Sequence, residues 1–232
     1  MPYFPKDPTA PPVEKAPVNV WDLPTRLFHW ILVLLVVTSF VTANIGGNAM
    51  QYHVWSGETI LALLLFRLIW GFIGSGTVRF TLFVRGPAAA WRYARSLLGP
   101  DAERHLGHNP LGGWSIVAML LALGFQAVSG LFATDDIATQ GPLYPLVSDA
   151  TAARVTDLHQ FNAGVIITLV CLHIVAILFY LLVKKENLVK PMITGHKLWQ
   201  GPLDPKMTDV QPSWLALIMA AVCIAGIFYW LR

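Results

Sequence analysis

Two histidines fourteen residues apart lie within one apolar segment of membrane-spanning length. His159 and His173 both fall between Leu158 and Val183. In an α-helix this spacing is close to four turns, so both imidazoles project from nearly one face, about 21 Å apart along the axis. The hydrocarbon core of a bilayer is about 30 Å thick, so one histidine would lie near each membrane surface. Two stacked cofactors held by one helix require this arrangement.

Two further histidines complete matched pairs. His29 lies near the start of the first apolar segment and His53 at the start of the second, which predicts that His29 has the depth of His173 and His53 that of His159. A lone histidine in a membrane helix is often hydrogen-bonded to a neighbouring helix, and this explanation is available for each of the four. Four at two matched depths favour ligation of metal or haem. A six-coordinate haem requires two axial ligands, which imidazoles from facing helices can supply.

Two arginines are expected at the level of the inner pair. Arg67 follows His53 by fourteen residues, so it should reach that level from the same helix face. A buried arginine in lipid needs a partner, and a haem propionate is one candidate. Pairing with Glu58 or contact with the cytoplasmic headgroups is the alternative for Arg67. Arg26, one turn before His29, is a second candidate for a propionate, although headgroup contact is favoured there.

The composition is that of a membrane protein. The chain has 232 residues, 55% hydrophobic and 12% charged, whereas soluble domains have about 25% charged residues. Cys171 and Cys223 fall inside apolar runs, so neither a disulfide framework nor a paired-cysteine metal site is expected. The net charge of +3 comes from residues beside membrane segments and does not indicate a nucleic-acid partner.

Five apolar runs are long enough to cross a bilayer, and without strict alternation they predict helices rather than barrel strands. Asp22 could cap the first helix, and Pro24 suits its first turn. The third and fifth runs contain no internal histidine and are expected to support the ligand helices. The runs are Leu27–Asn44, Val54–Ile73, Leu111–Ala133, Leu158–Val183 and Trp214–Leu231.

The chain divides into three parts. Residues 1–20 form a proline-rich tail, predicted to be extended or disordered and cytoplasmic, without the features of a secretory signal. Residues 21–197 hold four of the apolar runs and all four paired histidines. Residues 198–232 contain a linker and the fifth run.

Lysine and arginine in the connecting segments predict the orientation. Segments 75–110 and 184–212 carry five arginines and five lysines, respectively, whereas 134–157 has four aspartates and one arginine. Positive loops stay inside, so the N-terminus and both basic segments are expected to be cytoplasmic. The acidic segment 134–157 then faces outside.

The sequence resembles the prokaryotic cytochrome b561 family, which includes the b-type cytochrome subunits of nickel–iron hydrogenases. The resemblance covers roughly residues 18–197. The motifs that carry it are VWDLPTRLFHW (20–30), FRLIWG (66–71), GHNPLGG (107–113), the helix from His159 to His173, and NLVKPMITG (187–195).

The resemblance implies an all-α membrane protein, with a four-helix transmembrane haem-binding bundle and here a fifth C-terminal transmembrane helix outside it. Two haem b groups are expected, the inner one on His29 and His173 and the outer one on His53 and His159. The protein would carry electrons between quinone, such as ubiquinone, and a redox partner in the bacterial cytoplasmic membrane. That partner would be a c-type cytochrome or hydrogenase subunits, which makes the chain an electron-transfer oxidoreductase or a subunit of one.

Two other functions remain open. Some members of the family oxidise superoxide and pass the electron to quinone, but an acidic outer face should repel that anion. A histidine-based metal transporter would need more polar residues along its path, and Glu58 is almost the only one available.

Three further histidines and five glycines lie outside these predicted pairs. His105, His108 and His196 lie in the basic segments and are expected to be solvated or to face headgroups, although His108 opens the third helix and could touch an inner quinone. Five glycines would let a flat macrocycle approach the backbone, but helix packing is the commoner reason for such residues. They are Gly57, Gly71, Gly124, Gly130 and Gly164.

Overall fold

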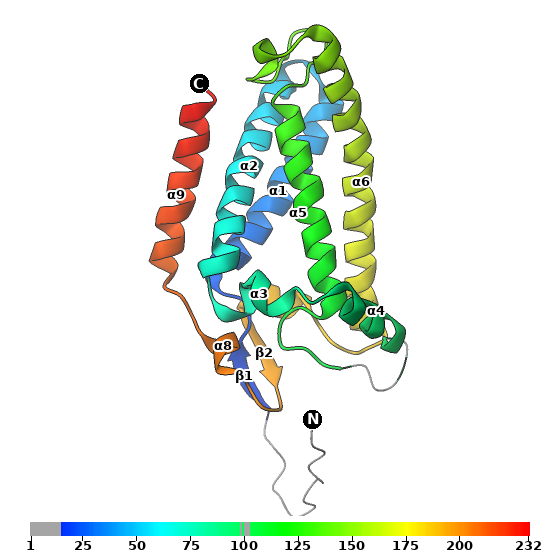
Figure 1. Cartoon of the computed structure of the whole chain (residues 1–232), viewed down its shortest axis with the longest axis vertical. Helices are drawn as coiled ribbons and strands as arrows, with labels where there is room; N and C mark the ends of the chain where they lie inside the picture. The colour runs from blue at the N-terminus through cyan, green and yellow to red at the C-terminus, as the bar shows by residue number, and fades with distance from the viewer. Residues whose placement is uncertain (1–14, 98, 100–102) are drawn as a thin grey trace, which may run out of the picture.

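Five long helices form the body of the protein (Figure 1). The computed structural model describes residues 15–97, 99 and 103–232. Each long helix is long and apolar enough to cross a membrane, which confirms the predicted all-α membrane architecture. The helices are α1 (Leu23–Ile45), α2 (Met50–Ile73), α5 (Pro110–Gly130), α6 (Asp149–Leu182) and α9 (Ser213–Trp230).

The helix ends follow local capping chemistry. The Asp22 side chain accepts a hydrogen bond from the Thr25 amide, and Pro24 lies in the first turn of α1, as predicted. The helix α6 begins nine residues before the predicted start, because Ser148 caps a polar stretch that hydropathy alone does not mark as helical. Conversely, α5 ends three residues early, at Gly130.

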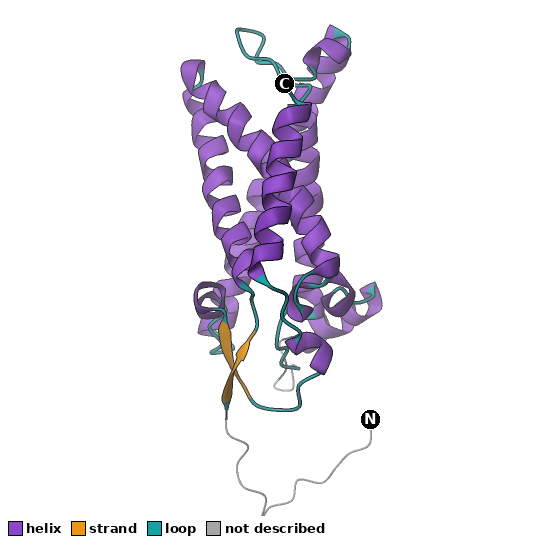
Figure 2. Cartoon of the chain, turned by 90° about the vertical axis from the view of Figure 1, so that its left-hand side faces the viewer, coloured by secondary structure: helices purple, strands orange, loops and turns teal. Residues whose placement is uncertain are grey.

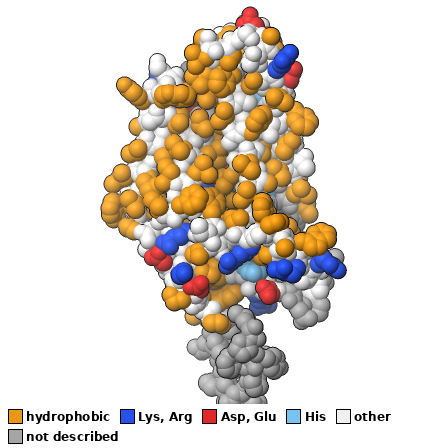
Figure 3. Space-filling view, in the orientation of Figure 1, with side chains coloured by type: hydrophobic (Ala, Val, Ile, Leu, Met, Phe, Trp, Pro, Cys, Tyr) orange, Lys and Arg blue, Asp and Glu red, His pale blue; other side chains and the backbone are white. Residues whose placement is uncertain are grey.

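The helix α2 lies at the centre of the packing. It contacts α1, α5 and α9, while α6 packs on α5. The buried cluster between α2 and α9 includes Leu63, Phe66 and Trp70 on one side and Ala216 and Cys223 on the other. The long helices expose many large apolar side chains, and Figure 3 shows one face of this surface, which lipid would cover.

Short elements gather at one end of the bundle, which we call the inner end (Figure 2). The strand β1 (Ala16–Asn19) pairs antiparallel with β2 (His196–Trp199), with Asn19 opposite His196. The predicted tail 1–20 therefore ends in a paired strand, whereas residues 1–14 lie outside the described part. The other short elements at this end are α3 (Phe80–Phe83), α4 (Pro87–Ser96), α7 (Val189–Thr194), α8 (Pro205–Thr208) and the 3-10 turn η2 (Gly76–Val78). Two further 3-10 turns, η1 (Gly47–Ala49) and η3 (Tyr144–Leu146), lie at the opposite end.

Polar side chains fasten the inner end to the helices. The Asp22 carboxylate that caps α1 also accepts a hydrogen bond from Trp70 Nε1 of α2 at 3.0 Å. Arg79, after η2, pairs with Asp209 in the segment before α9. These bonds fix the loops around the ends of α1 and α2, close to where His29 and Arg67 lie.

Candidate functional site

The outer pair, His53 of α2 and His159 of α6, comes together in the structure. Their ring centroids lie 6.1 Å apart with an interplanar angle of 78°. His53 Nδ1 is 3.0 Å from the Ser39 carbonyl oxygen of α1. Because a carbonyl can only accept, Nδ1 carries the proton and the Nε2 lone pair of His53 is left for a ligand.

His159 is held by side chains from α5. Its Nδ1 lies 3.1 Å from Ser129 Oγ, and its Nε2 lies 3.0 Å from Gln126 Nε2. Asn162, one turn further along α6, donates through Nδ2 to Gln126 Oε1 at 2.7 Å and to the Ala122 carbonyl at 2.9 Å. The α5 helix therefore contacts a predicted ligand directly, in addition to supporting the bundle.

The outer pair fits axial ligation of a haem iron. A metal–imidazole bond is about 2 Å long, so two imidazoles on opposite sides of one ion place their ring centroids about 6 Å apart. The observed 6.1 Å matches this separation. Close approach also needs Gly130, because a Cβ atom there would lie 3.0 Å from His159 Cε1.

The inner pair comprises His29 of α1 and His173 of α6. Both side chains are half-buried, and His29 lies within electrostatic reach of His173. His29 Nδ1 is buried without a hydrogen-bond partner among the described residues. A buried polar atom without a partner costs about 1–3 kcal/mol, so such an atom marks a place where a further group would fit.

Arg67 is almost completely buried at this level, with 3% of its surface exposed. Its Nη2 donates to the Val78 carbonyl at 3.1 Å, and the guanidinium lies 4.6 Å from the centroid of the Phe80 ring. Its Nη1 is buried and has no hydrogen-bond partner among the described residues. No ion pair to Glu58 is found in that part of the chain, and the burial of Arg67 excludes contact with headgroups.

The Arg26 guanidinium already makes one hydrogen bond to a short element at the inner end. Its Nη1 donates to the Ile193 carbonyl of α7 at 2.6 Å, and its Nε is buried without a partner among the described residues. Any contact of Arg26 with lipid headgroups would therefore compete with this hydrogen bond to α7. Arg26 and Arg67 both keep a buried nitrogen that could donate to an anion.

His108 is largely enclosed by aromatic side chains and only partly exposed, so the expected solvation was largely wrong. Its ring lies 4.5 Å from the ring of Trp21 and 4.7 Å from that of Phe83, centroid to centroid. Burial, together with the charges of Arg67 and His173, lowers the pKa of His108 to about 3. The neutral His108 imidazole therefore lies at the inner level, in electrostatic reach of both residues.

The other two loop histidines differ from each other. His105 packs against Tyr93 with ring centroids 5.3 Å apart, and burial lowers the pKa of its imidazole. Its expected solvation is therefore only partial. His196 is exposed in β2, as predicted.

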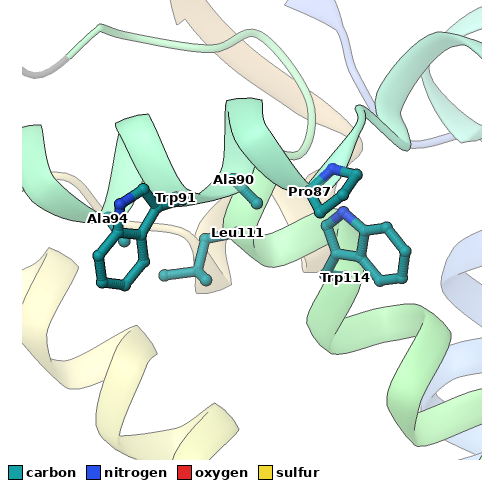
Figure 4. Close-up of a pocket in the computed structure, with 6 residues that line it drawn as sticks. All are labelled: Pro87, Ala90, Trp91, Ala94, Leu111 and Trp114. Carbon is teal, nitrogen blue, oxygen red and sulfur yellow. The ribbon is translucent and has the colours of Figure 1, made fainter.

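A shallow groove lies on the outside of the bundle, between α4 and α5 (Figure 4). It has a volume of about 360 Å³, and none of the four paired histidines lines it. Trp91 and Trp114 flank it, and tryptophan is a residue enriched at membrane interfaces. Its lining is formed by Pro87, Ala90, Trp91, Ala94, Leu111 and Trp114.

Gln126, Ser129 and Asn162 were missed by the sequence reasoning. Gln126 and Ser129 are three residues apart and so share a face of an otherwise apolar helix. Asn162 follows His159 by one turn. Polar residues on the inward face of a membrane helix are a usable signal, and a search for that spacing would have found them.

A helical membrane bundle that brings histidines of facing helices together is the architecture expected of a membrane b-type cytochrome. The family model described as prokaryotic cytochrome b561 matches residues 20–195. The chain belongs to this family. The match includes α1, α2, α5 and α6, which carry the four paired histidines, Arg26 and Arg67, and leaves α9 outside.

Similar curated proteins are named as probable Ni/Fe-hydrogenase B-type cytochrome subunits. The one from Rhizobium leguminosarum bv. viciae is 23% identical over 83% of this chain and 93% of its own length. Those from Rhodobacter capsulatus and Azotobacter vinelandii are 22% and 24% identical, each over 79% of this chain and over 82% and 89% of their own lengths. No solved structure matches the chain.

Proposed function

We propose that the protein is a di-haem b-type cytochrome that carries electrons across the cytoplasmic membrane between quinone and a redox partner. The observation that carries this proposal is the 6.1 Å separation of the His53 and His159 rings, which suits two axial ligands of one iron. The outer haem is held by these two residues. The inner haem is held by His29 and His173.

The inner assignment rests on the buried groups around it. His29 Nδ1 and Arg67 Nη1 lack partners among the described residues. A haem propionate would satisfy Arg67 with a charge-assisted hydrogen bond, and Arg26 Nε is a second donor for the same group. The Arg67 charge would also favour the reduced haem, because a nearby cation stabilises added negative charge.

When bound, the two haems supply one-electron chemistry. The chain itself sets their spacing, because the two α6 ligands are fourteen residues apart, which is about 21 Å along the helix. The long apolar helices keep water away from both levels. With both haems bound, this spacing would let electrons pass between the two membrane surfaces.

We infer that the inner end faces the cytoplasm and that the N-terminus is cytoplasmic. Figure 3 shows lysine and arginine side chains gathered at this end, below the apolar body. Positive segments stay inside, so the inner pair lies near the cytoplasmic surface. The α1–α2 turn and the acidic segment 134–157 face the periplasm.

The names of the relatives support a nickel–iron hydrogenase as redox partner. A c-type cytochrome is the second candidate, because the periplasmic segment is acidic and would attract a basic protein. Within it, Asp135 accepts hydrogen bonds from three backbone N–H groups, which lower its pKa to about 2 and keep it anionic. Rates of electron exchange with a basic cytochrome should fall as salt rises.

A visible spectrum of the purified protein tests the haem assignment. Two haems per chain and sharp reduced bands are expected. His173→Ala should remove one haem, and His53→Ala should remove the other. A colourless protein, or a His173→Ala variant that retains both haems, would contradict the assignment.

The redox partner is tested separately. The tagged protein is purified from membranes of a strain that expresses a nickel–iron hydrogenase. Co-purification and hydrogen-dependent haem reduction are expected. Reduction by a basic c-type cytochrome, without response to hydrogen, would instead support the second candidate.

A further inference from the structure

His159 is the only one of the four paired histidines with side chains hydrogen-bonded to both ring nitrogens within the described residues. Ser129 Oγ lies 3.1 Å from Nδ1, and Gln126 Nε2 lies 3.0 Å from Nε2. Both partners come from α5, a helix that carries no proposed iron ligand.

Donor and acceptor roles in this cluster are fixed by its outer members. Ser129 Oγ donates to the Gln126 backbone carbonyl at 3.1 Å, so its lone pair accepts from His159 Nδ1. An amide nitrogen has only hydrogens to give, so Gln126 Nε2 donates to His159 Nε2. His159 is therefore the tautomer with its proton on Nδ1 and a lone pair on Nε2.

Asn162 determines which way the Gln126 amide points. Its Nδ2 group has two hydrogens, and both are used, one by the Ala122 carbonyl and one by Gln126 Oε1. With its oxygen held by Asn162, Gln126 turns its NH₂ group toward His159. The four side chains form one chain of hydrogen bonds in which every role is consistent.

We propose that Ser129, Gln126 and Asn162 are positioning residues for His159, which hold its Nε2 lone pair ready to ligate the outer haem iron. This inference rests on the proposed function. Ser129 acts in the haem-loaded protein, because its bond to Nδ1 is compatible with iron on Nε2. Gln126 acts before loading, because its amide and the iron use the same lone pair, and the amide yields that lone pair on ligation.

The two roles predict different defects. A hydrogen bond accepted from Nδ1–H makes the imidazole a stronger donor, which stabilises ferric iron. Ser129→Ala should therefore raise the midpoint potential of one haem and leave the other unchanged. Gln126→Leu and Asn162→Leu should lower the occupancy of that haem, about tenfold or more in affinity, while the potential of the haem retained stays the same.

The experiment is a redox titration of the full-length protein in membranes, combined with a count of haems per chain. Ser129→Thr keeps the hydroxyl and should restore the wild-type potential. Thr168→Ala is the matched control, because Thr168 is exposed and donates only to the Gly164 carbonyl within α6. This control should change neither potential nor occupancy.

The outcomes separate this inference from the proposed function. If His159→Ala removes one haem but Ser129→Ala and Gln126→Leu match wild type in potentials and occupancy, only the positioning role is overturned. If His159→Ala leaves both haems in place, the ligand assignment itself is wrong. A loss of thermal stability in Ser129→Ala without a change in potential would reduce its role to helix packing and overturn the proposal for that residue.

Discussion

The outer and inner histidine pairs differ in what surrounds them. At the outer pair, His53 is bonded to the Ser39 carbonyl and His159 to Ser129 and Gln126. At the inner pair, His29 Nδ1 and the neighbouring Arg67 Nη1 have no partner among the described residues. The polypeptide thus holds the outer histidines by itself, whereas under the proposed function a bound group would satisfy the buried nitrogens at the inner level.

The largest effect should come from closing the space beside His159. Gly130→Ala places a Cβ atom 3.0 Å from His159 Cε1, and Ser129 and Gln126 leave the ring little room to move. We expect haem retention at the outer pair to fall about tenfold or more, measured as haem per chain and as the amplitude of the reduced bands. The inner haem should remain.

Gly124→Ala provides the control on the same helix. A Cβ atom at Gly124 meets no heavy atom within 4 Å, so this variant should bind both haems. Full haem content and an unchanged spectrum in Gly130→Ala would instead show that α5 and α6 can move apart to make room for the methyl group. The outer histidine pair would then be less rigidly held than we infer.

Next in size is the effect of the Arg67 charge on the inner pair. Arg67→Leu should lower the potential of the inner haem by roughly 60 mV, equivalent to about 1.4 kcal/mol for one electron, because a buried cation no longer stabilises the reduced state. Redox titration of both haems measures this. Arg67→Lys keeps the charge and should retain most of the potential, whereas a shift of the outer haem alone would place Arg67 at the wrong level.

His108, at the inner end, should make the stability of the folded protein depend on pH. Its pKa is about 3 in the folded protein and about 6.5 when unfolded, so the unfolded chain takes up a proton that the folded chain excludes. Stability from this residue is therefore lost as pH falls below about 6.5, by about 2 kcal/mol between pH 7 and pH 5.

Thermal unfolding of the full-length protein at these two pH values gives the measurement. His108→Gln should lose less stability on acidification than wild type. His196→Gln is the control, because His196 is exposed, and it should behave like wild type. Equal losses in wild type and His108→Gln would mean that other groups cause the acid sensitivity.

The sequence predicted the parts of this comparison that depend on hydropathy and spacing. Long apolar runs mark the five helices, and the fourteen-residue interval between His159 and His173 on one helix face marks the two levels. The helix-capping role of Asp22 was equally local. Such features depend on neighbours in the chain, which a sequence displays directly.

Tertiary contacts could not be predicted in the same way. The burial of His108 depends on Trp21 and Phe83, which come from other segments, and its location in a basic loop suggested the opposite. The pairing of β1 with β2 joins residues about 180 positions apart, with no alternating pattern in either short strand. Likewise, the role of α5 at His159 depends on which face of α5 meets α6.

The smallest effect is expected from the ion pair at the surface of the inner end. Arg79 pairs with Asp209, with 23% and 42% of the two side chains exposed, and its Nε also donates to the Gly74 carbonyl at 2.6 Å. Exposed ion pairs are worth about 0.2–1 kcal/mol and are screened by salt. Asp209→Asn should therefore lower the melting temperature only slightly, and less at 0.5 M than at about 0.05 M salt. Arg79→Gln should lower the melting temperature further, because it also removes the donor to the Gly74 carbonyl at the end of α2.

Loss of the inner haem in both variants would contradict this expectation. The loops at the inner end would then position His29 and His173 as firmly as α5 positions His159. The two ends would no longer differ in their dependence on a bound group.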